Sequence, residues 1–122
     1  ENADVAIEKT CKLTGAQIID YTVAPLFMNG RSKGGHEWLI EFRKQPESLE
    51  EFTQILDESL KGVNSDYEAK RYLDMTLGMP HVHAARQGLF YDWMKVKNKL
   101  GGQHKVPRLS NERDYLEELM SL

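Results

Sequence analysis

The sequence has little cysteine and no long hydrophobic run, and both absences narrow the class of protein. Its 122 residues contain a single cysteine, Cys11, so an internal disulfide is excluded. Such sparing use of cysteine is typical of a reducing compartment, and we expect a cytoplasmic location. No apolar run approaches the roughly 20 residues that a membrane-spanning helix needs, so no membrane partner is expected.

An excess of positive charge is also missing. The formal net charge is -3, which argues against a general nucleic-acid binder. The charges that are present are unevenly distributed, since the segment 47–58 carries acids and no cation, whereas the segment 95–108 carries cations and no acid. The cations of this basic segment are Lys95, Lys97, Lys99, Lys105 and Arg108. Such a segment is suited to attract a small anion.

The spacing of apolar residues predicts one domain of the α+β class, with a small, mainly antiparallel sheet of three to four strands covered by helices. The expected helices are 2–14, 48–63, 65–72, 87–97 and 111–120, and the expected strands are 16–24, 36–42 and 80–85. The first two strands read as an antiparallel hairpin. The predicted capping pairs are Ser48–Glu51, Ser65–Glu68 and Asn111–Asp114. Gly15 is expected to end the first helix and Pro25 the first strand.

The strand 36–42 alternates between two faces. Trp38, Ile40 and Phe42 share one face, and Glu37, Leu39 and Glu41 share the other, where contact of the two acids with solvent is expected. The expected aromatic core consists of Trp38, Phe42, Phe52, Phe90 and Trp93. Cys11 lies on the apolar side of the first helix and is interpreted as a small core residue rather than a nucleophile.

The segment 101–108 holds the side chains best suited to chemistry. Gly101 and Gly102 allow close backbone approach to a ligand, and Gln103 can donate hydrogen bonds. Lys105 supplies a mobile point charge and Arg108 a forked one. These groups can hold a phosphate or stabilise negative charge that develops during phosphoryl or adenylyl transfer, although the spacing is not that of a Walker A loop. The alternative is an ordinary solvated loop between two helices.

Histidines present a second, weaker pattern. His81 and His83 share one face of the third predicted strand, and with His36 or His104 they could form a metal site. No acid cluster at ligand spacing accompanies them, so ordinary strand-face histidines are the preferred interpretation, and no metal is expected in this domain.

Several stretches of the chain resemble one known family. The segments 88–93 and 99–111, together with 21–25, 38–42, 64–67 and 69–71, are similar in order to the C-terminal end of the auxin-responsive Gretchen Hagen family, in its bacterial branch. The plant members have a Gln-x-Lys-x-Pro-Arg run near their end. That run matches Gln103, Lys105, Pro107 and Arg108 here.

The resemblance implies a function. Members of this family are acyl-acid amido synthetases, which activate a carboxylic acid with ATP to an acyl-adenylate and pass the acyl group to an amine. It implies that residues 1–122 form a mobile C-terminal domain that closes over an N-terminal adenylation domain. By this match Lys105 is the catalytic candidate, and Gly101, Gly102, Gln103 and Arg108 contact phosphate or nucleotide. ATP and Mg²⁺ would be bound mainly by the N-terminal domain, and the isolated C-terminal domain would be inactive.

Two other interpretations are open from the residues. The chain could be a stand-alone module that binds an anion or an acidic protein through the segment 95–108, in which case binding would weaken with added salt. It could also be a purely structural dimerisation domain, for which substitution of the cations would have no effect.

Overall fold

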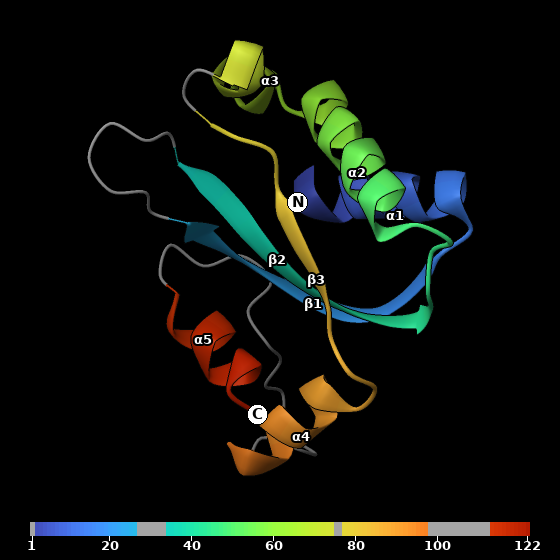
Figure 1. The fold of residues 1–122 in the computed structure, drawn as a ribbon, viewed down its shortest axis with the longest axis vertical. Coiled ribbons are helices and arrows are strands. Elements are labelled where there is room, and N and C mark those ends of the chain that lie inside the picture. Colours follow the sequence, from blue (N-terminus) through green and yellow to red (C-terminus); the bar gives the residue numbers. More distant parts are fainter. Residues whose placement is uncertain (1, 27–33, 75–76, 98–112) are drawn as a thin grey trace.

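The protein is described by a computed structural model covering residues 2–26, 34–74, 77–97 and 113–122 (Figure 1). The elements, in chain order, are α1 (Asn2–Thr14), β1 (Gln17–Leu26), β2 (Gly35–Lys44), α2 (Leu49–Val63), α3 (Ser65–Arg71), the short 3-10 helix η1 (Tyr72–Asp74), β3 (His81–Ala84), α4 (Leu89–Val96) and α5 (Asp114–Met120). Every predicted helix and strand is therefore present. Within the described ranges no helix is long and apolar enough to cross a membrane.

The sheet has three strands in the order β1-β2-β3. β1 and β2 form the predicted antiparallel hairpin, in which Val23 lies opposite Trp38. β3 runs parallel to β2, with Val82 opposite Trp38, so the sheet is mixed, while its longer strand pair, β1 with β2, is antiparallel as predicted. The reason is the connection, because the chain leaves β2, crosses through α2 and α3, and starts β3 at the same end of the sheet as β2.

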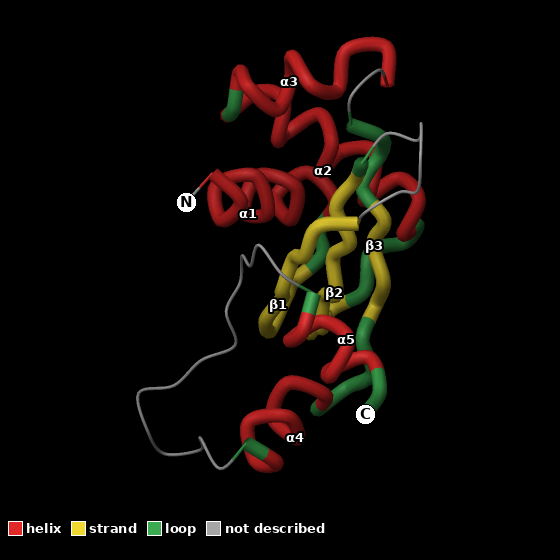
Figure 2. The backbone as a smooth tube through the Cα atoms, turned by 90° about the vertical axis from the view of Figure 1, so that its left-hand side faces the viewer, coloured by secondary structure: helices red, strands yellow, loops and turns green. Residues whose placement is uncertain are grey.

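Helices cover both faces of this sheet (Figures 1 and 2). α1 and α2 pack on one face over Trp38, Ile40 and Phe42, and α4 and α5 pack on the other over Ala24 and Leu39. β2 therefore contributes side chains to two cores. All five predicted core aromatics are confirmed, since none is more than 4% exposed.

Two of the local signals behave as predicted. The Ser48 hydroxyl accepts a hydrogen bond from the Glu51 amide at 3.1 Å, which caps α2. Gly15 follows α1 with a left-handed φ of 79°, and its amide donates to the Cys11 carbonyl at 2.8 Å.

Three other signals differ from the prediction. α3 is capped by Asn64, not Ser65, because the extended backbone of Asn64 lets its Oδ1 accept from the amides of Asp66 and Tyr67. β1 continues through Pro25 to Leu26, which is compatible with a missing N–H because β1 lies at one edge of the described sheet. The predicted cap Asn111 lies outside the described residues, and α5 starts after Arg113 without a side-chain cap.

Candidate functional site

The segment predicted to carry the chemistry lies between α4 and α5. Lys105, Gly101, Gly102, Gln103 and Arg108, like His104, all fall outside the described residues. The structure does describe the residues on either side of it, from Gly88 to Lys97 and from Arg113 to Leu122. We therefore take the two flanking helices and the strand that holds them as the candidate site.

Glu41 of β2 holds the start of α4. Its carboxylate accepts from the Gly88 amide at 2.8 Å and from the Phe90 amide at 3.1 Å, and so replaces a side-chain cap. Gly88 has a φ of 85°, a conformation that glycine adopts without strain. The prediction that Glu41 faces solvent is wrong, because α4 covers it and it is 3% exposed. A negative charge at a helix N-terminus also interacts favourably with the helix dipole.

The end of α4 is held against α5. The indole Nε1 of Trp93 donates to Glu118 Oε1 at 2.7 Å, and Lys97 Nζ forms an ion pair with the same oxygen at 2.9 Å. The Trp93 ring also meets Tyr115 edge to face, with ring centroids 5.7 Å apart. The two helices that bound the segment 98–112 are therefore in direct contact.

Arg113, the first described residue after that segment, is fixed by three acceptors. Its Nη2 donates to Glu37 Oε1 at 2.7 Å, its Nη1 to the Pro25 carbonyl at 2.9 Å, and its Nε to Glu117 Oε2 at 3.0 Å. One side chain thus connects the start of α5 to β1 and β2. Burial opposes ionisation of this guanidinium, but the hydrogen bonds from the two carboxylates outweigh it and raise the pKa of Arg113.

Glu37 also contacts β3. Its second oxygen, Oε2, lies 2.6 Å from His83 Nε2, while Oε1 pairs with Arg113. Burial raises the pKa of the Glu37 carboxyl, but hydrogen bonds from Arg113 and His83 outweigh it, so the pKa lies below its usual range. The prediction that Glu37 faces solvent is also wrong, since its side chain is 12% exposed and lies between Arg113 and His83.

The histidines do not assemble a metal centre in the part of the chain that the structure describes. No group of three or more His, Cys, Asp or Glu side chains there is placed to hold a metal ion. His83 instead pairs with Glu37. His36 and His83 lie on β2 and β3, and His104 is outside the described residues.

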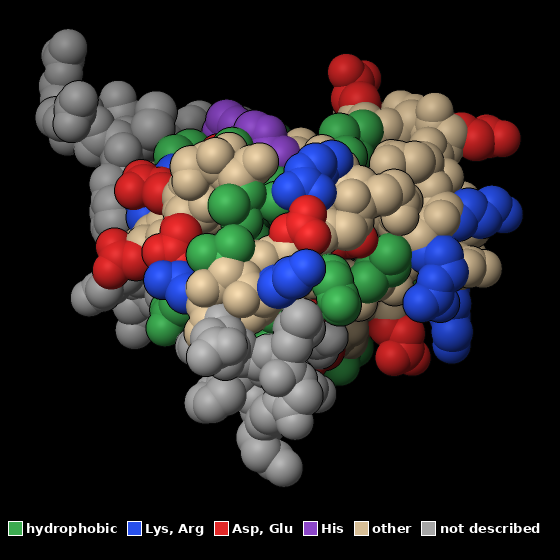
Figure 3. All heavy atoms as spheres, turned by 90° about the horizontal axis from the view of Figure 1, so that it is seen from below, with side chains coloured by type: hydrophobic (Ala, Val, Ile, Leu, Met, Phe, Trp, Pro, Cys, Tyr) green, Lys and Arg blue, Asp and Glu red, His purple; other side chains and the backbone are tan. Residues whose placement is uncertain are grey.

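Charges of both signs lie side by side around α4 and α5. Seen from below the view of Figure 1, Lys and Arg side chains are interspersed with Asp and Glu side chains (Figure 3). Arg86 pairs with Asp92 at 2.9 Å, and Lys97 of the basic segment pairs with Glu118. The basic segment 95–108 is thus partly neutralised at its first turn, which weakens its attraction for an added anion.

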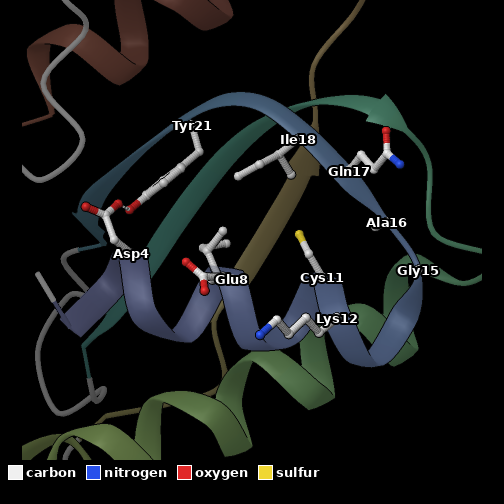
Figure 4. A pocket seen from close by; sticks show the side chains of 10 residues that line it. Asp4, Glu8, Cys11, Lys12, Gly15, Ala16, Gln17, Ile18 and Tyr21 are labelled. Atoms are coloured by element: carbon white, nitrogen blue, oxygen red, sulfur yellow. Dashed lines mark hydrogen bonds between the residues drawn. The ribbon is translucent and has the colours of Figure 1, made fainter.

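Cys11 lies in a groove of about 570 Å³ between α1 and β1 (Figure 4). Its thiol points from α1 toward β1, and at the other end of the groove the Tyr21 hydroxyl donates to Asp4. Cys11 packs half-buried against the first core, close to its predicted role. Burial raises the pKa of the thiol, which disfavours the thiolate that a nucleophile requires.

Sequence reasoning did not identify Arg113, Glu37, Glu41 and Glu118 as residues of the candidate site. Acidic residues alternating with apolar ones look the same in a strand that is solvated on one face and in one that is covered on both. Leu39, which lies between Glu37 and Glu41, and the apolar positions of α4 and α5 are the signals that this face of β2 is covered.

The fold agrees with comparisons to known proteins. The family model of the GH3 family C-terminal domain matches residues 1–114. Two solved structures are similar in fold: the AtGH3.15 acyl acid amido synthetase in complex with 2,4-DB (TM-score 0.72, 18% identity) and a GH3.15 acyl acid amido synthetase (TM-score 0.76, 19% identity). Each match covers 98% of this chain and 23% of the other, so the chain spans about a quarter of the length of these synthetases. No curated protein is a match. Since the family model covers nearly the whole chain, the chain belongs to the GH3 family, as its C-terminal domain.

Proposed function

We propose that this domain is the mobile C-terminal part of an ATP-dependent acyl-acid amido synthetase, which closes over an N-terminal adenylation domain and supplies Lys105 to the acyl-adenylate. The observation that carries the proposal is the match of residues 1–114 to the GH3 C-terminal domain. It is supported by the fold, which this chain shares with acyl acid amido synthetases.

The reaction explains why a cationic segment is needed. In the first half, a carboxylate oxygen of the acid attacks the α-phosphorus of ATP, and pyrophosphate leaves. In the second half, an amine attacks the acyl carbon and AMP leaves. Both the carboxylate and the phosphates are anionic, so Lys105 stabilises charge that develops in the transition state, and Arg108 screens the repulsion.

The neighbouring residues have supporting roles in this proposal. Gly101 and Gly102 permit close backbone approach to the phosphates, and Gln103 donates a hydrogen bond. Mg²⁺ would neutralise the phosphates of ATP, and it would be bound chiefly by the N-terminal domain.

The described flanks are suited to this task. Glu41 caps α4, Glu118 joins α4 to α5, and Arg113 ties α5 to the sheet. A segment that starts and ends on such a fixed frame loses less conformational freedom when it meets a substrate.

The decisive experiment is Lys105→Ala in the parent enzyme, with ATP–pyrophosphate exchange as the readout. We expect exchange to fall about 10²- to 10³-fold, as for the loss of one transition-state donor, with unchanged thermal unfolding. The matched control is Lys95→Ala, which removes an exposed cation of the same basic segment at the α4 end and should leave exchange intact.

If exchange survives in Lys105→Ala, the catalytic assignment is wrong. An intact mass of the natural gene product near 14.1 kDa would contradict the two-domain proposal itself. Salt-sensitive binding of ATP or AMP by the isolated 122-residue chain would favour the stand-alone binding module instead.

A further inference from the structure

Leu73 of η1 combines a strained backbone with an exposed apolar side chain. Its φ of 52° and ψ of 27° lie in the left-handed region, which a leucine rarely adopts and which glycine or asparagine adopts more easily. Its side chain is 74% exposed, so burial within the domain does not offset that strain. The stability of this domain alone therefore gives no reason for a leucine at this position.

The residue before Leu73 is also large, apolar and exposed. Tyr72 is 66% exposed, so an aromatic and an aliphatic side chain lie next to each other on the surface at the end of α3. Single exposed hydrophobic residues are ordinary on a protein surface, whereas an adjacent pair with a strained backbone is typical of a contact site. Tyrosine is also one of the residue types that contribute most to binding energy at interfaces. We call Tyr72 and Leu73 the η1 pair.

The η1 pair follows a firmly held residue. Arg71 donates from Nε and Nη2 to the two Asp57 oxygens of α2 at 2.8 Å each, and from Nη1 to the Leu77 carbonyl at 3.0 Å. The Leu77 amide in turn donates to the Lys70 carbonyl at 2.9 Å. Side chains that are positioned in advance lose less conformational entropy on binding, so this base favours the use of the η1 pair as a contact.

The small size of the η1 pair indicates the kind of partner. A stable interface between separate proteins buries about 800 Å² on each side, far more than two side chains offer. A partner on the same chain needs a smaller contact, because tethering gives an effective concentration that can reach about millimolar. This chain is a C-terminal domain and covers 23% of the length of each similar synthetase, so most of such an enzyme lies outside it.

We propose that the η1 pair docks on the N-terminal domain of the parent enzyme, in an apolar depression that receives the Leu73 side chain. This inference rests on the proposed function for the existence of that domain, and not on the catalytic role of Lys105. α3, which leads into η1, lies at the upper end of the view in Figure 1, and α4 and α5 lie at the lower end. The contact is therefore distinct from the one proposed for Lys105.

Hydroxyl-radical footprinting of the parent enzyme and of the 122-residue chain tests this contact. Oxidation of Tyr72 and Leu73, read by mass spectrometry, should be at least about threefold lower in the parent enzyme, because an interface excludes solvent from its centre. Leu13 of α1, which is 64% exposed, is the matched control and should be oxidised equally in both proteins. The footprint is independent of ATP–pyrophosphate exchange, so this proposal and the one for Lys105 can fail separately.

Leu73→Asn removes the apolar side chain and suits the left-handed backbone. In the 122-residue chain it should leave the melting temperature unchanged or raise it, whereas in the parent enzyme it should restore the oxidation of Tyr72. Leu13→Asn should leave Tyr72 protected in the parent enzyme.

Three results would overturn the proposal: equal oxidation of the η1 pair in both proteins, protection of Leu13 as strong as that of Leu73, or a lower melting temperature in Leu73→Asn. Protection of Leu73 in the 122-residue chain as its concentration rises would identify a second copy as the partner, and would overturn it too.

Discussion

Arg113 Nη2 lies 2.7 Å from Glu37 Oε1, and this contact joins the start of α5 to the central strand β2. The Arg113 and Glu37 side chains are 22% and 12% exposed, so solvent screens the pair only in part. Because Arg113 directly follows the segment 98–112, the pair fixes one end of the proposed catalytic segment.

A double-mutant cycle on Glu37→Gln and Arg113→Met measures this contact. We expect each single substitution to destabilise the domain and the coupling free energy to be about 1 kcal/mol, as for neighbouring charged side chains that are partly buried. Urea unfolding of the four proteins gives the value. Additive effects of the two substitutions would show that the pair contributes nothing to stability.

The stability of the domain should depend on the charge of Glu37. Its pKa is lowered from 4.5 in the folded state, so the folded protein binds fewer protons there than the unfolded chain does. The stabilisation is therefore fully present above pH 4.5 and is lost as the pH falls through the lower folded-state value. Glu37→Gln should lose less stability than the wild type on acidification, which urea unfolding across the acidic range measures. Parallel curves for the two proteins would contradict this.

The buried pair Asp57–Arg71 should be the most sensitive charged contact. Arg71 Nε and Nη2 donate to the two Asp57 oxygens at 2.8 Å each, both side chains are at most 5% exposed, and Tyr67 also donates to Asp57. Arg71→Met leaves the Asp57 charge buried without its main partner. We therefore expect the free energy of unfolding, measured by urea unfolding, to fall by about 3–5 kcal/mol.

Lys70→Met is the matched control for Arg71→Met, since Lys70 pairs with Asp66 on the exposed side of the same helix. Lys70→Met should lower the free energy of unfolding by about 0.5 kcal/mol or less. Similar decreases in the free energy of unfolding of Arg71→Met and Lys70→Met would refute the prediction that the buried pair is the more sensitive one.

Two glycines should respond in opposite directions to alanine. Gly88 has a φ of 85°, so Gly88→Ala should destabilise the domain by about 1 kcal/mol or more. Gly62 lies inside α2, where an added Cβ would meet only Lys9 Nζ at 3.9 Å, so Gly62→Ala should stabilise by about 0.5–1 kcal/mol. Melting temperatures compared under identical conditions test both signs, and a stabilised Gly88→Ala would refute the first.

Local signals allowed most of the elements to be predicted. The helical spacing of Phe52, Leu56 and Leu60 defines α2, and the alternation of Trp38, Ile40 and Phe42 defines β2, because both patterns reflect burial on one side. The family resemblance was likewise readable from short motifs. Its proposed catalytic residue, Lys105, stays a prediction.

The errors share a physical cause, which is that strand pairing and layer contacts are not local. Whether β3 joins β2 in parallel depends on the path of α2 and α3, and not on the residues of β3. Glu41 is polar in sequence yet buried, because the backbone amides of Gly88 and Phe90 compensate its charge. Arg113 was missed since its partners Pro25 and Glu37 are distant along the chain.

Placing β2 at the centre has a consequence for cooperativity. Consecutive residues of this strand, Leu39 and Ile40, belong to different cores, so a displacement of its backbone loosens both at once. The two helical layers therefore cannot melt one after the other. We expect a single unfolding transition, with amides in α1 and α4 losing their protection against hydrogen exchange through the same global opening.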